Sequence, residues 1–77
     1  MTKLRRPRQP MPPFVRAALE EHGLADAYRA RPPYQRNDYL LWINSARLET
    51  TKIRRMRRML RELAAGRGYM GMAWREK

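Results

Sequence analysis

From Pro32 to Leu63 the chain runs PPYQRNDYLLWINSARLETTKIRRMRRMLREL, and this stretch decides the fold. It holds most of the apolar residues that can form a core, together with the densest run of positive charge. Apolar residues recur every three or four positions on both sides of Arg47–Leu48, which is the period of an amphipathic helix. The pattern predicts two antiparallel helices joined near Arg47–Leu48, within an all-α bundle of three main helices and one short helix.

The composition of the whole chain limits its chemistry. Its 77 residues suffice for one domain, and a domain of this size buries too little surface to be very stable. The chain has no cysteine and one histidine, which excludes disulfides and sites built from several thiolates or imidazoles, so no cofactor or metal is expected. Eighteen Lys and Arg against seven Asp and Glu give a net charge of +11. This charge predicts a polyanionic partner, with simple solubility as the alternative.

Two helices are predicted before the central stretch. The first covers residues 13–22, because prolines suit its first turn and Gly23 can end it. A short helix over residues 24–30 follows. Pro32 and Pro33 stop it, because the residue before a proline is pushed out of helical geometry. The residues expected to face inward are Val15, Ala18, Leu19, Leu24, Ala27 and Tyr28.

The third predicted helix covers residues 33–46. Its apolar stripe consists of Tyr39, Trp42, Ile43 and Ala46, with Leu40 beside them. Trp42 is expected at the centre of the core, where its indole N–H would need an acceptor. Stacking of Trp42 and Tyr39 on nucleic-acid bases is the alternative, although helical spacing favours packing. Tyr34, outside the stripe, is a further stacking candidate.

The fourth helix is predicted over residues 49–65 and ends at Gly66. Its apolar seam consists of Ile53, Met56, Met59, Leu60 and Leu63. Basic side chains cover the remainder, and Glu62 relieves this charge at the far end, four residues after Arg58. Like charges this close on one helix repel, and an anion lying along the helix would offset the repulsion. A solvated face whose charges extend into water is the alternative.

This basic helix and the N-terminal arm form the candidate anion site. Residues 1–11 are basic and rich in proline, so we expect an extended arm that either lies along phosphates or is a disordered terminus. The predicted nucleic-acid or anion-binding residues are Arg5, Arg6, Arg8, Lys52, Arg54, Arg55, Arg57, Arg58 and Arg61. Between Lys52 and Arg61 no Asn, Gln or Ser is present to distinguish bases, which predicts binding to RNA or DNA backbone without sequence specificity.

The C-terminal tail suggests a second kind of site. Residues 67–77 combine glycines with aromatic side chains and are expected to pack on a helical domain formed by residues 12–66. The alternative is an interaction segment that binds a protein partner, because exposed aromatic groups of this kind are unusual on a monomer. Its candidate residues are Tyr69, Met70, Met72 and Trp74.

Other classes of protein fit the sequence less well. The acidic residues are scattered, and no pair shares one helix face in a polar cleft, so we expect a protein that is not an enzyme. The longest apolar run, Tyr39–Ile43, is far shorter than the ~20 residues of a membrane span. Prolines stand where a signal peptide would place its apolar region, which predicts a cytoplasmic protein. Adsorption to an anionic membrane surface is a weaker alternative, because the apolar face is needed for the core.

The order of motifs in the chain is Pro-Pro, a short polar run, Tyr, Trp-Ile, Ala-Arg, Glu-Thr and Ile. This order resembles the YdeI/OmpD-associated family of bacterial proteins, which is also labelled bacteriocin-protection. The matching positions are Pro33, Gln35, Arg36, Tyr39, Trp42, Ile43, Ala46, Arg47, Glu49, Thr50 and Ile53. Arg47 stands where lysine is usual, and Leu48 stands where proline is common.

The resemblance covers roughly Pro12 to Met72 and corresponds to the C-terminal helical module of the family. It implies a small helical fold and a bacterial source. It also implies a link to envelope stress, porin association and protection from bacteriocins. It implies no catalytic residues.

Overall fold

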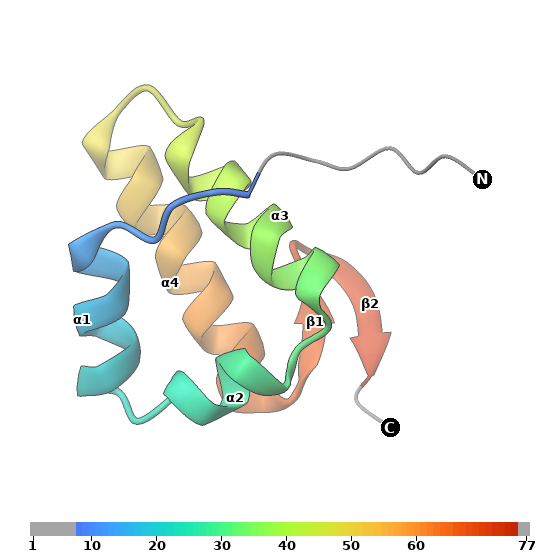
Figure 1. Cartoon of the computed structure of the whole chain (residues 1–77). Helices are drawn as coiled ribbons and strands as arrows, with labels where there is room; N and C mark the ends of the chain where they lie inside the picture. Colours follow the sequence, from blue (N-terminus) through green and yellow to red (C-terminus); the bar gives the residue numbers. More distant parts are fainter. Residues whose placement is uncertain (1–7, 76–77) are drawn as a thin grey trace.

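The computed structural model describes residues 8–75. Within them lie the helices α1 (Pro13–Glu21), α2 (Ala25–Ala30), α3 (Pro33–Asn44) and α4 (Glu49–Ala65), followed by the strands β1 (Arg67–Tyr69) and β2 (Met72–Arg75). Figure 1 shows α3 and α4 running antiparallel, with the β1–β2 hairpin beside the C-terminal end of α4. The predicted all-α class is confirmed, and among the described residues the departure from it is this short two-stranded sheet.

The helix boundaries follow local signals in the sequence. Proline occupies the first turn of α1 and of α3, where its missing N–H would have no helical partner. Gly66 ends α4 in the left-handed conformation, with φ of 72°, which glycine adopts without a steric penalty. The predicted bounds of α4 are confirmed, whereas α1 ends one residue and α3 two residues before the predicted positions.

The core is formed mainly by α1, α3 and α4. Its largest fully buried side chains are Val15, Gln35, Tyr39, Ile43 and Met59. Tyr28, Leu19, Leu40 and Leu63 complete the buried cluster. Most of these residues were expected inside from their helical spacing, because one face of each helix repeats every three or four residues.

Two predictions about the core are wrong. Trp42 does not occupy the centre of the core. It is half-buried and packs at the margin of the core cluster, which includes Tyr39 and Ile43. Ile53 is 38% exposed and does not belong to the buried seam of α4. Both residues lie at the flank of an apolar stripe, roughly 80–100° around their helix from its centre, so a neighbouring helix covers them only in part.

The C-terminal segment forms a hairpin that the sequence did not predict. Tyr69 pairs with Met72, and the turn between them consists of Met70 and Gly71, whose φ angles are 52° and 87°. Two consecutive positive φ angles are typical of the type I′ turn, which matches the twist of a β-hairpin. The ring of Tyr69 packs edge-on against Tyr39, with centroids 5.7 Å apart, which places the hairpin on the core.

Candidate functional site

The outer face of α4 carries a continuous group of cations. We define the arginine stripe as Arg54, Arg57, Arg58 and Arg61, all of which are exposed. Their spacing of three and four residues places them on one side of a helix, opposite the buried Met59 and Leu63. Among residues 8–75, no ion pair and no hydrogen bond is formed by the side chains of the stripe. The structure therefore brings four of the predicted anion-binding residues together on one open surface.

Two predicted cations of α4 lie outside the stripe. Arg55 donates from Nη1 to the carbonyl oxygen of Trp42 at 2.7 Å, and its guanidinium carbon lies 5.5 Å from the centroid of the Trp42 ring. Lys52 is half-buried, and its Nζ lies 4.0 Å from a carboxylate oxygen of Glu49. The Arg55 contacts join α4 to α3, whereas the Lys52 contact lies within α4.

The described part of the N-terminal arm, residues 8–11, forms its hydrogen bonds with α3. Arg8 is exposed, whereas Arg5 and Arg6 lie outside the described residues. The backbone N–H of Gln9 donates to Asn37 Oδ1 at 2.8 Å, and Asn44 Nδ2 donates to the carbonyl oxygen of Pro10 at 3.0 Å. Residues 9–10 are thus fixed to α3, and within residues 8–75 the predicted anion-binding residues that share one surface are those of the stripe on α4.

A buried polar cluster lies beside the stripe, on the flank of α4 that faces α3 and the hairpin. We define the polar clamp as Arg31, Gln35, Tyr39 and Glu62. The Arg31 guanidinium donates to Gln35 Oε1 at 3.1 Å, to the Gly68 carbonyl oxygen at 2.7 Å and to the Glu62 carbonyl oxygen at 3.0 Å. One buried cation thereby connects the α2–α3 junction, the C-terminal end of α4 and the first strand of the hairpin.

The carboxylate of Glu62 completes the clamp from the other direction. It accepts hydrogen bonds from the Tyr39 hydroxyl and from the backbone N–H groups of Met70 at 2.8 Å and Gly71 at 2.9 Å. Burial, together with the hydrogen bond to Glu62 and its negative charge, raises the pKa of Tyr39 well above its usual value. Tyr39 therefore stays protonated and donates, and the hairpin turn is held by a carboxylate that is itself buried.

The polar clamp was not predicted. Glu62 was expected to relieve the positive charge beside Arg58, whereas it is 8% exposed and bonded to the hairpin. The available signal was its position three residues after Met59, on the flank of the buried seam. For Arg31 the helical pattern held no comparable signal, because two of its acceptors are backbone carbonyl groups brought close by the tertiary structure.

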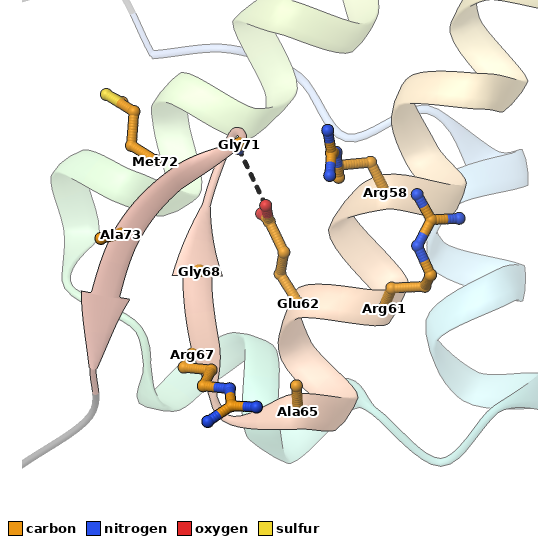
Figure 2. A pocket seen from close by; sticks show the side chains of 9 residues that line it. All are labelled: Arg58, Arg61, Glu62, Ala65, Arg67, Gly68, Gly71, Met72 and Ala73. Carbon is orange, nitrogen blue, oxygen red and sulfur yellow. Dashed lines mark hydrogen bonds between the residues drawn. The ribbon is translucent and has the colours of Figure 1, made fainter.

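The stripe leads into an open hollow between α4 and the hairpin. We define the basic hollow by its lining residues, which are Arg58, Arg61, Glu62, Ala65, Arg67, Gly68, Gly71, Met72 and Ala73. Figure 2 shows arginines at the α4 wall and at the base of β1, with the Glu62 side chain directed at the turn at Gly71. Three of its residues are arginines, and most of the others are too small to fill it.

The alternative protein-interaction residues have different environments. Tyr69 and Met70 are half-buried and pack against the core cluster, and the Tyr69 hydroxyl donates to Asp38 Oδ2. Met72 is 56% exposed, and the side chain of Trp74 lies outside the described part. Of these four residues, Met72 is therefore the one whose side chain the structure shows open to a partner.

The described residues offer neither a cluster of metal ligands nor a membrane-spanning helix. Within residues 8–75, no three His, Asp or Glu side chains are grouped so that they could hold a metal ion. A bilayer span would need a longer and more apolar helix than any found in the same residues. His22, the one histidine of the chain, is exposed at the C-terminal end of α1.

Fold and surface together define a small helical module with a basic outer helix and a C-terminal hairpin that is bonded to the buried polar clamp. Comparison with protein families then identifies the group to which it belongs. The family model described as bacteriocin-protection, YdeI or OmpD-associated matches residues 10–66, and the chain belongs to this family. The resemblance deduced from the motifs is thereby confirmed, with the hairpin β1–β2 beyond the matched residues. Neither the curated proteins nor the solved structures gave a significant match.

Proposed function

We propose that this protein binds the phosphate backbone of nucleic acids through the arginine stripe, without catalysis and without sequence specificity, and that it acts in the cytoplasm. The observation that carries the proposal is the set of four exposed arginines on one face of α4 with no acidic partner among residues 8–75. Guanidinium groups bind phosphate oxygens in a bidentate manner, and such contacts position a protein on a nucleic acid.

The electrostatics of the helix support this partner. Arg54 and Arg58, four residues apart, repel each other, as do Arg57 and Arg61, and each such pair costs a few tenths of a kcal/mol in the free protein. Phosphates placed along the helix would remove that repulsion and release counterions. The stripe offers four guanidinium groups and no side-chain amide, so it lacks the group that pairs with adenine, and its row of like cations suits phosphates along a backbone.

The proposal is tested by the salt dependence of binding to a generic DNA duplex and to a structured RNA. Fluorescence anisotropy over a series of salt concentrations measures the slope of log K against log [salt]. Four phosphate contacts predict a slope of about −3.6 on duplex DNA. The variant Arg54→Gln/Arg57→Gln removes two of these contacts, so its slope should fall to about −1.8. Absence of binding at low salt would contradict the proposal.

A matched control separates a local site from net charge. Arg16 on α1 and Arg47 before α4 are exposed and lie outside the stripe. The variant Arg16→Gln/Arg47→Gln loses the same two charges as Arg54→Gln/Arg57→Gln, so a general attraction would weaken equally in both. A site on the stripe predicts that the control keeps the slope of the parent protein.

A second candidate function follows from the family. The family description reads bacteriocin-protection, YdeI or OmpD-associated, and exposed Met72 beside the hollow offers an apolar contact for a protein partner. This alternative predicts that a strain lacking the gene is killed by bacteriocin at lower doses, and that the parent protein restores survival while Met72→Glu does not. Equal restoration by Arg54→Gln/Arg57→Gln and the parent would favour this function over the first.

A further inference from the structure

The C-terminal hairpin leaves one of its two strands with an open edge. β1 is tied to the helices, because the Gly68 carbonyl oxygen accepts a hydrogen bond from Arg31 and the turn is bonded to Glu62. β2 is the outer strand of the two-stranded sheet, and Figure 1 shows β1 between it and the helices. Within residues 8–75, no strand pairs with the outer edge of β2, where Met72 and Ala73 are exposed.

An open strand edge presents a regular set of hydrogen-bonding groups. In an antiparallel pair, every second residue directs its N–H and C=O toward the neighbouring strand, and the residues between them direct theirs outward. The outward groups of β2 (Met72–Arg75) can therefore pair with the backbone of an added strand. The backbone of a nucleic acid carries no N–H donors, so this edge selects a polypeptide in extended conformation.

The cations beside the hairpin are distributed along it. Arg58 lies at the turn, because its Nη2 is 3.7 Å from the position that a Cβ on Gly71 would occupy. Arg67, the first residue of β1, lies at the other end of the hairpin, and Figure 2 shows the two arginines at opposite ends of the basic hollow. This arrangement suits an extended chain with several carboxylates, which passes each cation in turn, better than one compact anion.

The charge of these two arginines is not neutralised within the described part of the chain. Neither Arg58 nor Arg67 forms an ion pair there. Glu62 is the one acidic residue that lines the hollow, and its carboxylate is occupied by a hydroxyl and two backbone N–H groups. A second copy of the chain, with its net charge of +11, would bring the same cations to the edge, so repulsion opposes pairing of β2 with itself.

We propose that the outer edge of β2 binds an acidic polypeptide segment, which adds to the hairpin as a third strand. Side chains of a strand alternate between two faces, so acidic residues at every second position would all face the basic hollow. The added strand would lie about 10 Å from β1, a distance that the long side chains of Arg67 and a glutamate can span. The proposal goes beyond nucleic-acid binding and does not depend on it, although Arg58 belongs to both surfaces.

The other face of the added strand has an apolar contact. Met72 is 56% exposed, and Figure 2 shows its side chain directed away from α4. The residues between the acidic positions would face this side, where an apolar side chain can pack against the flexible thioether. The expected ligand is therefore an extended segment in which acidic and apolar residues alternate.

The first test uses a six-residue peptide of alternating glutamate and valine, blocked at both ends, on the full chain. Two-dimensional NMR follows the backbone amides of residues 72–75, and hydrogen exchange measures their protection. Saturable shifts are expected, with exchange of at least one β2 amide slowed about tenfold or more at saturation, because an outward N–H gains an acceptor. Absence of binding, or shifts confined to α4, would overturn the proposal.

Two control peptides separate strand pairing from attraction between opposite charges. One carries a methyl group on every backbone nitrogen, which removes the donors and keeps the three carboxylates. The other has the same composition with its glutamates grouped at one end. The methylated peptide should bind at least about tenfold more weakly, and the grouped peptide should fall between the two. Equal binding of the parent and methylated peptides would show general attraction and contradict pairing at the edge.

Two single variants locate the peptide on the protein. Arg67 borders the hollow and lies outside the stripe, whereas Arg54 belongs to the stripe and lies outside the hollow. Arg67→Gln should weaken binding of the alternating peptide about threefold, as expected for one exposed ion pair. Arg54→Gln should leave the affinity unchanged. Equal losses in the two variants, or a larger loss in Arg54→Gln, would argue against the hairpin as the site.

A final comparison keeps this proposal distinct from nucleic-acid binding. Arg54→Gln/Arg57→Gln should weaken binding of a DNA duplex and keep the affinity for the peptide. Peptide binding by a parent protein that binds no nucleic acid would support the open edge while it rejects the nucleic-acid function. Loss of peptide binding in Arg54→Gln/Arg57→Gln would place the peptide on the stripe and overturn the proposal. A dimer of the parent protein with protected β2 amides would overturn it as well, because a second copy would then occupy the edge.

Discussion

On the flank of α4 that faces the hairpin, Glu62 is 8% exposed and its carboxylate accepts three hydrogen bonds. On the outer side of the same helix, the four side chains of the arginine stripe are exposed to solvent. Both sides belong to the same three turns of helix. A buried carboxylate is costly unless donors replace the water that it loses, and here each donor is part of the fold. Exposed guanidinium groups have no such requirement, because water solvates them.

This difference separates the groups that stabilise the fold from those available to a ligand. Substitution in the polar clamp removes partners from buried groups, so it should lower the free energy of unfolding. Substitution in the arginine stripe removes exposed charges that repel one another, so it should affect binding and leave stability almost unchanged. Four changes, ordered by expected effect on stability, test this separation.

Replacement of Glu62 should have the largest effect. Glu62→Ala leaves the Tyr39 hydroxyl and the N–H groups of Met70 and Gly71 without their acceptor, and a loss of about 3 kcal/mol is expected. Urea unfolding followed by circular dichroism measures this loss. Glu62→Gln retains one acceptor oxygen, so its loss should be smaller. Unchanged stability in both variants would show that the clamp does not hold the hairpin.

A methyl group at Gly68 should have the next largest effect. Its Cβ would lie 3.0 Å from Cγ of Glu62, and the φ of 93° is unfavourable for any residue with a side chain. We expect Gly68→Ala to destabilise the protein by about 2 kcal/mol. Gly23→Ala is the control, because its φ is +66° but nothing lies within 4 Å of the added Cβ. Equal losses at the two positions would mean that backbone strain alone acts and that the approach of Glu62 is unimportant.

The Tyr39 hydroxyl gives a smaller effect that depends on pH. Its pKa is raised in the folded protein, so above the unfolded value of 10.0 the native state retains a proton that the unfolded chain releases. The resulting stability is fully present below pH 10.0 and is lost as the pH rises toward the folded pKa. Tyr39→Phe should cost about 1 kcal/mol at pH 7 and make the decline above pH 10.0 shallower. Urea unfolding of Tyr39→Phe and of the parent protein from pH 7 to pH 11 measures the cost at pH 7 and the decline above pH 10.0. Equal declines of the free energy of unfolding in the two proteins would show that Tyr39 does not cause the loss at high pH.

The smallest change is expected on the outer face. Arg54→Gln/Arg57→Gln removes mutual repulsion along α4, so stability should stay within about 0.5 kcal/mol of the parent protein or rise slightly. Thermal unfolding at low and high salt measures this, because screening should reduce the gain. A loss of more than about 1 kcal/mol would show that these arginines support the fold and would remove the contrast between the two sides of the helix.

Local signals predicted much of the helical architecture. Prolines at the first turns and Gly66 at the end of α4 restrict the backbone directly, so the helix positions follow from neighbouring residues. Of the candidate site, the arginine stripe was also within reach, because residues three and four apart share a helix face whatever the tertiary structure. Its members could not be separated from Arg55, since the position of Trp42 beside α4 is set by the tertiary structure, whereas the contact of Lys52 with Glu49, three residues earlier on the same helix, is local.

The sequence by itself determined the positions of the four helices to within two residues, the basic character of α4 and the family, since each depends on residue types at short spacings. Only the tertiary structure decided that Arg31 and Glu62 are buried and that residues 67–75 form a hairpin. Their stability depends on backbone groups from distant segments, such as the Gly68 carbonyl bonded to Arg31. A periodic pattern specifies which face of a helix is apolar, but a charged side chain enters the interior only where the folded chain supplies its partners.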